Sequence, residues 1–462
     1  MSSTVAKGNG SVAGLFEPST IILVGSSKLK EKVGMMNPRI FDSIHYNLKK
    51  FFSGNVTRCD VGDNVNELRR TLVNADLAII VLSASLANQA LAMCGEKGVK
   101  NVIVVPGGFK GSERTRLLQI ASEDGMRILG PNAIMGIINT KNGMNTTFEK
   151  DLMPKRGGLS VMSQSGGVGA ALADWAVFYG LGISKFAWLG DKADVDEVDV
   201  LNYLGKDEET EVILMYLESV KNGSEFLASV KEVTKSKPVV ILKGGVSEEA
   251  KARALSHTAA ISAGSDTIFR VGSKQNGAVI VDSMEELFIA GETLEKQPPM
   301  KGNRILIVSN VGGPAVLTAD ATHQYGLRLA KISMETAKKI ETSYEGVEAL
   351  NPLDIIADAR ADRYAFILES ALKEDEVDGV LVINMLKSCL TTPEDVRVIP
   401  DISKKYPEKP VVDCAPGGED YKKISDMLEG TRIPVFNTPE KAVFALKVLN
   451  DYGQYLSRTQ KK

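Results

Sequence analysis

Histidine and cysteine are both scarce in this chain of 462 residues, which has three histidines and four cysteines. The cysteines lie far apart and include no C-x-x-C pair: Cys59, Cys94, Cys389 and Cys414. Zinc sites and disulfide frameworks both need cysteines at characteristic separations, so neither is predicted. Scattered thiols of this kind are typical of a protein in a reducing cytoplasm.

Long apolar runs and an excess of one charge are also absent. No stretch approaches the roughly 20 apolar residues that a membrane-spanning helix needs. The N-terminal sequence MSSTVAKGNGSVAGLF lacks the apolar core of a signal peptide, and we expect it to form a short flexible leader. With 55 basic and 58 acidic residues, the net charge of −3 gives no electrostatic reason to expect binding to nucleic acid or to an anionic membrane.

Several motifs of known chemistry are missing too. There is no G-x-x-x-x-G-K-[ST] phosphate loop and no H-E-x-x-H zinc motif, so neither an ATP-binding module nor a metal site is recognisable. The turn VGSS after the first apolar run lacks a complete G-x-G-x-x-G, and no acidic residue is clearly placed for a ribose. These gaps argue against a nicotinamide-dependent dehydrogenase.

What is present in the first part of the chain is an alternation of short apolar runs with amphipathic segments. The runs are rich in Val and Ile, end in Gly, Ser, Pro or Asn, and cover residues 20–27, 55–62, 76–84, 101–108 and 127–132. This pattern is typical of parallel strands that are buried on both faces and connected by helices. We therefore predict a doubly wound, Rossmann-like domain over residues 1–147.

The rest of the sequence contains an internal repeat. The segment GLSVMSQSGG from Gly158 returns as RILIVSNVGG from Arg304, at an offset of 146 residues without a gap. The same offset aligns the Tyr-Gly-Leu tripeptides that begin at Tyr179 and Tyr325. We predict two related flavodoxin-like α/β domains over residues 148–297 and 303–462, joined by a proline-containing linker.

Two residues that are present in the first copy alone could carry chemistry. His257 lies in SHTAAISAGS, a loop of small residues, and a neutral imidazole is a competent nucleophile towards phosphorus. Glu218 ends the apolar run EVILMYLES, where open α/β sheets place their ligands. Taken singly, each residue has an alternative interpretation: His257 as a loop histidine without a role, and Glu218 as a solvated glutamate at a strand end. His45 and His323 lie in helix-like stretches and are expected to be structural.

The two glycine-rich regions that follow predicted strands are candidate anion sites. The turn between a strand and a helix in the first copy would bind phosphate through its backbone, and it comprises Ser163, Gln164, Ser165, Gly166 and Gly167. Strand ends of the first domain form a rim on which a long ligand with phosphates and an adenine could lie. The rim residues are Gly25, Ser26, Ser27, Ser83, Ala84, Pro106, Gly107, Gly108, Phe109, Pro131 and Asn132. Ordinary turn chemistry remains the alternative for both regions.

Taken together, these features resemble the succinyl-CoA synthetase superfamily over nearly the whole chain. The first two regions are similar to the α subunit of that enzyme, through GPNAIMG in the first region and SQSGG, YLES and SHTAA in the second. The third region, with SNVGGP and NPLDI, is similar to the α subunit of ADP-forming acetyl-CoA synthetase. The resemblance implies that His257 is the residue that is phosphorylated, that Glu218 assists it, and that the rim binds CoA.

The resemblance also implies an activity and a partner. The activity would be that of an acid–CoA ligase, which interconverts acyl-CoA, ADP and phosphate with acid, CoA and ATP. Coenzyme A and phosphate would bind to this chain. Mg-ADP or Mg-ATP would bind to an ATP-grasp β subunit in an α2β2 complex. A non-catalytic CoA-binding regulatory protein of the same fold is the alternative, although such a protein would need no histidine loop.

Overall fold

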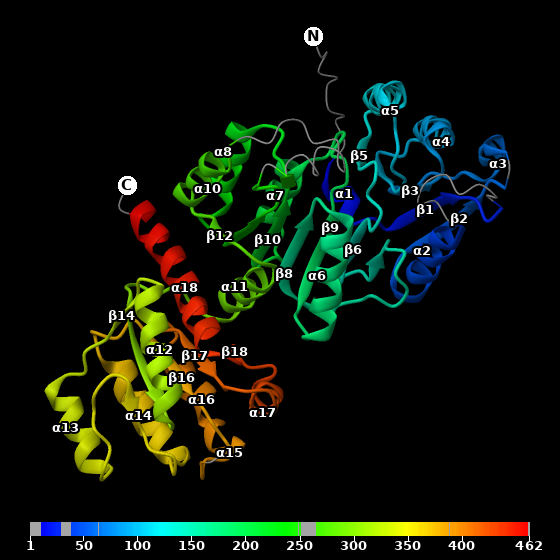
Figure 1. Ribbon diagram of the computed structural model, residues 1–462. Helices are drawn as coiled ribbons and strands as arrows, with labels where there is room; N and C mark the ends of the chain where they lie inside the picture. The colour runs from blue at the N-terminus through cyan, green and yellow to red at the C-terminus, as the bar shows by residue number, and fades with distance from the viewer. Residues whose placement is uncertain are drawn as a thin grey trace. The chain divides into compact units, whose positions relative to one another are not determined.

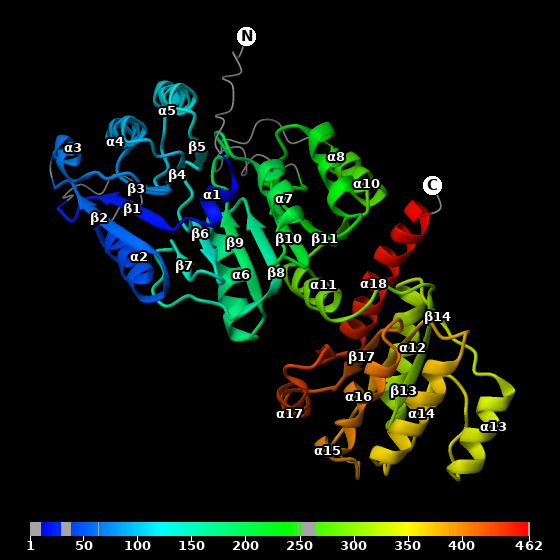
Figure 2. The same cartoon turned by 180° about the vertical axis from the view of Figure 1, so that it is seen from behind.

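The computed structural model describes residues 11–28, 38–62, 64–247, 249–250, 265–387 and 389–460 (Figures 1 and 2). The chain divides into two compact units, Met1–Leu287 and Phe288–Lys462. Among the helices of the described ranges, none combines the length and the apolar character that a membrane crossing requires.

The first sheet of the N-terminal unit has five parallel strands in the order β2-β1-β3-β4-β5. They are β1 (Thr20–Gly25), β2 (Asn55–Asp60), β3 (Leu77–Val81), β4 (Asn101–Val104) and β5 (Arg127–Leu129). Apolar side chains of the central strands are buried on both faces, as the sequence predicts. The helices that accompany this sheet are α1 (Ala13–Phe16), α2 (Pro38–Phe51), η1 (Val65–Glu67), α3 (Leu68–Thr71), α4 (Ala84–Glu96) and α5 (Gly111–Glu123). Helix α2 covers one face, and α4 and α5 cover the other (Figure 2).

The second sheet of this unit has seven strands in the order β12-β11-β10-β8-β9-β6-β7. The strands are β6 (Ile137–Asn139), β7 (Met144–Asn145), β8 (Arg156–Ser163), β9 (Ile183–Trp188), β10 (Val212–Leu217), β11 (Val239–Lys243) and β12 (Val279–Val281). Strands β8 to β12 are parallel, and β6 runs antiparallel to β9. Strands β6 and β7 lie within the predicted first domain, residues 1–147, but pair in this second sheet. The domain boundary at residue 147 remains a prediction.

Helices α6 (Gly166–Phe178), α7 (Glu197–Lys206), α8 (Gly223–Val233) and α10 (Asp266–Gln275) connect strands of the seven-stranded sheet, and α11 (Met284–Lys296) follows β12. The register pairs Ser163 of β8 with Tyr216 of β10 and with Trp188 of β9. The carboxyl ends of these three strands therefore lie at one edge of the sheet, where α/β folds carry their ligands.

The C-terminal unit contains one parallel sheet in the order β14-β13-β16-β17-β18, and β15 also pairs with β13. Its strands are β13 (Arg304–Ser309), β14 (Arg328–Leu329), β15 (Leu353–Asp354), β16 (Gly379–Ile383), β17 (Val411–Cys414) and β18 (Val435–Phe436). Its helices are α12 (Gly312–Gln324), α13 (Met334–Ser343), α14 (Ala361–Lys373), α15 (Pro393–Val396), α16 (Val398–Lys405), α17 (Glu419–Leu428) and α18 (Pro439–Gln460). Helices α14, α16 and α17 pack on one face of the sheet, and α12 packs on α18 (Figure 1). The predicted α/β fold with parallel sheets is confirmed.

Candidate functional site

A glycine turn joins β8 to α6 at the carboxyl edge of the seven-stranded sheet. Strand β8 ends at Ser163, and α6 begins at Gly166. Ser165 is the N-cap of this helix, and its hydroxyl accepts a hydrogen bond from the N–H of Val168 at 3.3 Å. Gly167 is exposed, with no heavy atom within 4 Å of the position that a Cβ would take. The unpaired N–H groups and the helix dipole make such a turn able to receive an anion.

The side chains of Ser163 and Gln164 are buried and engaged within the protein. The Ser163 hydroxyl donates to the carbonyl of Ser165 at 2.7 Å. Gln164, which is 3% exposed, donates from Nε2 to the hydroxyl of Ser219 at 3.0 Å. Its Oε1 accepts from the backbone N–H groups of Glu218 at 2.9 Å and of Ser219 at 3.0 Å. One amide side chain therefore ties the turn to the end of β10 and brings the Glu218 backbone beside it.

Glu218 directly follows β10 and is half-buried. The hydroxyl of Tyr216 donates to its Oε1 at 3.3 Å, and the ammonium of Lys243 donates to its carbonyl at 2.7 Å. Burial raises the pKa of Tyr216 above its ordinary value, and the nearby carboxylate reinforces this. The hydroxyl thus stays protonated at neutral pH and remains a donor to the carboxylate.

His257 lies outside the described residues, so its distance from Glu218 remains a prediction. The other two histidines lie on helices, as expected. His45 lies on α2 with Nδ1 at 3.5 Å from Nη1 of Arg58, and His323 is exposed near the end of α12.

A buried lysine beside the turn was missed by the sequence analysis. Lys192, which follows β9, has a side chain that is 4% exposed, and its Nζ lies 2.8 Å from Oε2 of the fully buried Glu197. The same ammonium donates to the carbonyl of Ser219 at 2.7 Å and to Oε1 of Gln164 at 3.3 Å. Its sequence signal is the charged run GDKADVDE directly after an apolar strand. A cation is therefore buried behind the candidate phosphate turn.

The predicted rim lies at the carboxyl edge of the five-stranded sheet. The Ser26 hydroxyl donates to the carbonyl of Gly62 at 2.6 Å, and the Ser27 N–H donates to Oδ1 of Asp60 at 3.2 Å. Burial alone would raise the pKa of Asp60, but hydrogen bonds from Ser27 and Gly62 lower it below its ordinary value. Asp60 ends β2, where Rossmann-like folds place an acidic group towards a ribose. The expectation from the sequence that no acidic residue lies at this place was therefore wrong.

Asn132 connects this rim to the loop that carries Lys192. Its backbone N–H donates to the carbonyl of Pro106 at 2.8 Å, and its Nδ2 donates to Oδ1 of Asp191 at 3.1 Å. Asn132 and Gly108 both have positive φ values, of 63° and 81°. The strand ends after β4 and β5 are therefore held together, as an extended ligand site would need.

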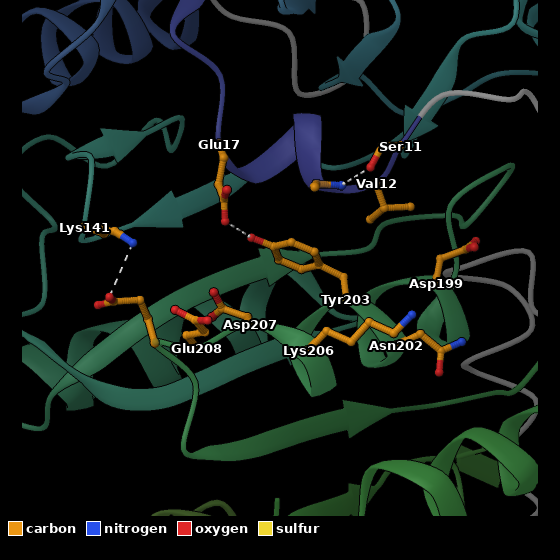
Figure 3. A pocket seen from close by; sticks show the side chains of 12 residues that line it. Ser11, Val12, Glu17, Lys141, Asp199, Asn202, Tyr203, Lys206, Asp207 and Glu208 are labelled. Carbon is orange, nitrogen blue, oxygen red and sulfur yellow. Dashed lines mark hydrogen bonds and ion pairs between the residues drawn. The ribbon is translucent and has the colours of Figure 1, made fainter. Parts of the chain in front are cut away.

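An open cavity of about 640 Å³ lies elsewhere, at the amino edge of the seven-stranded sheet (Figure 3). Its lining is polar and includes Glu17, Lys141 and Tyr203, and the Tyr203 hydroxyl donates to Oε1 of Glu17 at 2.7 Å. None of the predicted site residues lines this cavity. Strand β8 separates the two edges by roughly 25 Å at ~3.3 Å per residue, so the cavity is distinct from the candidate site. Within the described ranges, no group of three or more His, Cys, Asp or Glu side chains could hold a metal ion.

Comparison with known proteins adds independent evidence. Residues 156–294 match the model of the succinyl-CoA ligase like flavodoxin domain. The chain is 33% identical to the alpha subunit of ADP-forming acetate–CoA ligase II from Pyrococcus furiosus, over 94% of this chain and 96% of that one. It is 35% identical to ADP-forming acetate–CoA ligase I from Archaeoglobus fulgidus, over 97% of this chain, but spans only 64% of that protein.

Solved structures agree with these sequence matches. The dinucleotide-forming acetyl-coenzyme A synthetase 1 of Ca. Korarchaeum cryptofilum, in complex with phosphate and ADP, superimposes with a TM-score of 0.87 at 31% identity. The match covers 98% of each chain.

Proposed function

The chain belongs to the family of ADP-forming acetate–CoA ligases, and from this premise we propose that it is the alpha subunit of an ADP-forming acyl-CoA synthetase. The complete enzyme would interconvert acyl-CoA, ADP and phosphate with acid, CoA and ATP. Acetate is the proposed acid, because several relatives are named acetate–CoA ligases. Other acids are open, since a relative from Nitrosopumilus maritimus is named 4-hydroxybutyrate–CoA ligase.

The proposed chemistry proceeds in three displacements. A phosphate oxygen attacks the thioester carbonyl, the C–S bond breaks, and CoA leaves as the thiolate. An imidazole nitrogen of His257 then attacks the phosphorus of the acyl phosphate, and the carboxylate leaves. A terminal phosphate oxygen of ADP finally attacks the phosphohistidine, which releases the imidazole and gives ATP. Phosphoryl transfer of this kind depends mainly on positioning and charge stabilisation.

The observation that carries this proposal is the bridge made by Gln164. Its Oε1 accepts hydrogen bonds from the N–H groups of Glu218 and Ser219, so a carboxylate-bearing strand end lies against the helix N-terminus at Gly166 and Gly167. In our proposal Glu218 orients the imidazole and offsets its positive charge, and the turn binds the phosphoryl oxygens.

We also propose where the remaining ligands bind. Coenzyme A would lie along the rim of the five-stranded sheet, where Ser26, Ser27 and Asn132 are held by the contacts described above. Mg-ADP or Mg-ATP would bind to a separate ATP-grasp β subunit in an α2β2 complex. This is supported by the subunit name of the Pyrococcus relative and by the greater length of the Archaeoglobus protein. The four free cysteines support a reducing, cytoplasmic location.

Labelling with radioactive phosphate tests the proposal. The chain, its β subunit, acetyl-CoA and labelled phosphate should give acid-labile, base-stable label on the wild-type chain, and addition of ADP should transfer that label to ATP. His257→Ala should abolish both, because no other group is proposed to accept phosphorus. His323→Ala is the matched control and should retain full labelling.

The outcome also separates the proposal from its rival. A chain that binds CoA, but neither takes up label nor supports ATP formation with its partner, would be a regulatory protein of the same fold. Label that persists in His257→Ala would refute His257 as the phosphorylated residue.

A further inference from the structure

Lys192 and Glu197, the first residue of α7, form a buried ion pair, although the burial of two charges is energetically unfavourable. The side chains of Lys192 and Glu197 are 4% and 0% exposed, with Nζ and Oε2 2.8 Å apart. Removal of two charges from water carries a large desolvation penalty, and a well-packed apolar pair would often be at least as stable. Stability alone therefore does not account for this pair.

The backbone at Lys192 is also strained. Its φ is +49°, in the left-handed region that glycine adopts readily and that costs other residues roughly 1–2 kcal/mol. Strained residues persist where the surrounding structure holds them, and they cluster at functional sites. In this conformation the ammonium donates to the carbonyl of Ser219 at 2.7 Å.

The contacts of this lysine converge on Glu218. The ammonium contacts Gln164 Oε1 at 3.3 Å, and that same oxygen accepts from the N–H groups of Glu218 and Ser219. The carbonyl of Glu218 is fixed from its other side by Lys243 at 2.7 Å. Both peptide groups that flank Glu218 are thus held by side chains, those of the buried Gln164 and the half-buried Lys243.

We propose that Gln164, Lys192 and Glu197 form a positioning network that fixes Glu218 against the Ser165–Gly167 turn. Glu197 holds the ammonium, the ammonium holds Gln164 and the Ser219 carbonyl, and Gln164 holds the backbone of Glu218. This inference rests on the proposed function, because it assigns the network to the carboxylate that assists phosphoryl transfer. Small displacements of such a group lower rates by up to ~100-fold.

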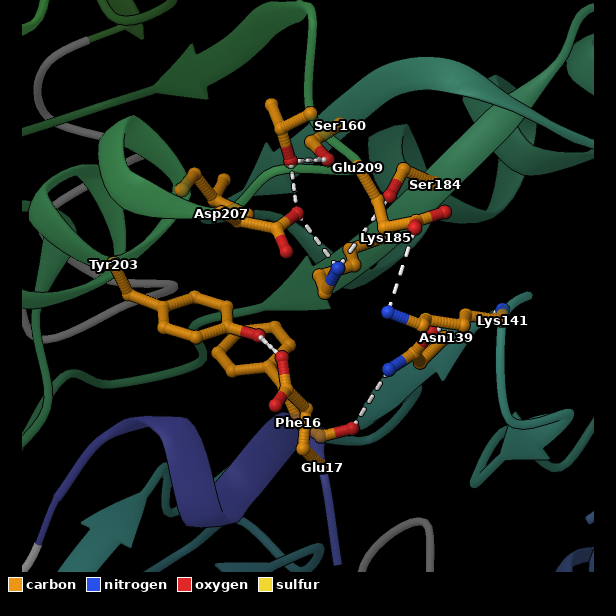
Figure 4. Close-up of polar contacts among 12 residues, drawn as sticks. Phe16, Glu17, Asn139, Lys141, Ser160, Ser184, Lys185, Tyr203, Asp207 and Glu209 are labelled. Carbon is orange, nitrogen blue, oxygen red and sulfur yellow. Dashed lines mark hydrogen bonds and ion pairs between the residues drawn. The ribbon is translucent and has the colours of Figure 1, made fainter. Parts of the chain in front are cut away.

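A second buried pair at the other end of α7 provides a matched control. Lys185 and Asp207 are 1% and 6% exposed, with Nζ 2.6 Å from Oδ2 (Figure 4). Asp207 also accepts from the hydroxyl of Thr210. This pair lies at the amino edge of the sheet and has no contact with the turn, so its role is structural.

Lys192→Met and Lys185→Met separate positioning from stability. Both variants should lower the melting temperature of the chain, since each leaves a buried carboxylate without its cation. Lys192→Met should slow single-turnover phosphorylation of His257 by roughly 10- to 100-fold. Lys185→Met should change that rate by less than about twofold, since its contacts do not reach Glu218. Affinity for CoA should be unchanged in both.

A double-mutant cycle provides the decisive readout. In a Glu218→Gln background, Lys192→Met should slow labelling by no more than about twofold further, because the network acts through the Glu218 carboxylate. A merely structural lysine would lower the rate by the same factor in both backgrounds, and that result would overturn the proposal.

A second variant covers a failure to fold, and two outcomes separate a failure of the proposed function from a failure of the positioning network. If Lys192→Met does not fold, Lys192→Met combined with Glu197→Gln removes both charges and should regain stability while labelling stays slow. If the wild type takes up no label, the proposed function itself fails. If the wild type is labelled and both Lys192 variants match its rate, the positioning network alone is wrong.

Discussion

The turn after β8 and the turn after β13 share their local geometry, although each belongs to a different unit. The hydroxyl of Ser163 donates to the carbonyl of Ser165 at 2.7 Å, and the hydroxyl of Ser309 donates to the carbonyl of Val311 at 2.6 Å. Each serine ends a strand, and each turn leads into a helix of 13 residues that begins with two glycines. The repeat that the sequence shows is thus reproduced at the level of single hydrogen bonds.

The side chain after the serine makes the same kind of hydrogen bond in both copies. Gln164 accepts from the backbone N–H groups of Glu218 and Ser219, while Asn310 accepts from the N–H of Met385 at 2.9 Å. Met385 therefore occupies the place of Glu218. The second copy retains the bridge between the two strand ends but has no carboxylate at that place.

Charge is what differs between the two surroundings. Behind the first turn lies the buried ammonium of Lys192. Near the corresponding strand ends of the second copy lie the fully buried carboxyl group of Asp413, whose pKa is raised by burial so that it stays protonated at neutral pH, and the carboxylate of Asp420, which is 3% exposed. Oδ2 of Asp420 accepts from the N–H groups of Leu386 and Lys387, both at 3.0 Å. The first turn thus has a buried ammonium behind it and the second has a buried carboxylate near it, so we expect only the first to favour a phosphate.

Matched substitutions of the residues at the two bridged strand ends should give the largest difference in the rate of His257 phosphorylation. Glu218→Gln should slow phosphorylation of His257 by ~100-fold or more, as is typical when a group that assists proton or charge transfer is removed. Met385→Gln, the matched change in the second copy, should alter the rate by less than about twofold. Single-turnover labelling measures both, and equal effects would contradict the assignment of chemistry to the first copy.

The buried carboxyl group of Asp413 should make the stability of the second copy depend on pH. Burial raises the pKa of Asp413 from its ordinary value near 3.8 to about 8. Its contribution to stability is therefore fully present below pH ~4 and is lost as the pH rises towards ~8, by at most about 1.4 kcal/mol per pH unit. Asp413→Asn should remove this dependence, and Oδ1 of the neighbouring Asn384, which has no hydrogen-bond partner among the described residues, is an acceptor for the new amide.

Hydrogen exchange of the β16 and β17 amides at pH 6 and pH 8 measures this effect within the intact chain. Once intrinsic exchange rates are corrected, wild-type protection should fall towards pH 8, and Asp413→Asn should retain it. Asp426→Asn, on the exposed surface of α17, is the control and should behave as the wild type. Wild-type protection that stays constant with pH would show that Asp413 is not held protonated.

Sequence patterns sufficed for much of this fold because its central strands are buried on both faces. Apolar runs bounded by Gly, Ser or Pro indicate such strands directly, and an ungapped offset reveals the repeat of β8 and α6 as β13 and α12. The antiparallel pairing of β6 with β9 was not foreseen, since β6 has only three residues and lacks the length of the other runs.

The network behind the first turn could not be predicted for a different reason. Gln164 and Glu218 are 54 residues apart, and their contact depends on the register of β8 with β10. Lysine is almost never fully buried, so composition rules assign Lys192 to the surface. The role of His257 rests on resemblance alone, because the residue lies outside the described part of the chain.

Substitutions at the N-caps of α6 and α12 should give the smallest effects, and they test whether helix geometry or nearby charge makes an anion site. Ser165 caps α6 with its hydroxyl, whereas Val311 provides no side-chain cap for α12. Ser165→Ala should destabilise the first turn of α6 by about 1 kcal/mol, and Val311→Ser should stabilise that of α12 by a similar or smaller amount. Hydrogen exchange of the first-turn amides reports both changes. If geometry alone made an anion site, Val311→Ser would also gain affinity for inorganic phosphate. We expect no such gain in a phosphate titration, because the buried carboxylate of Asp420 lies near that turn and opposes an anion however well the helix is capped.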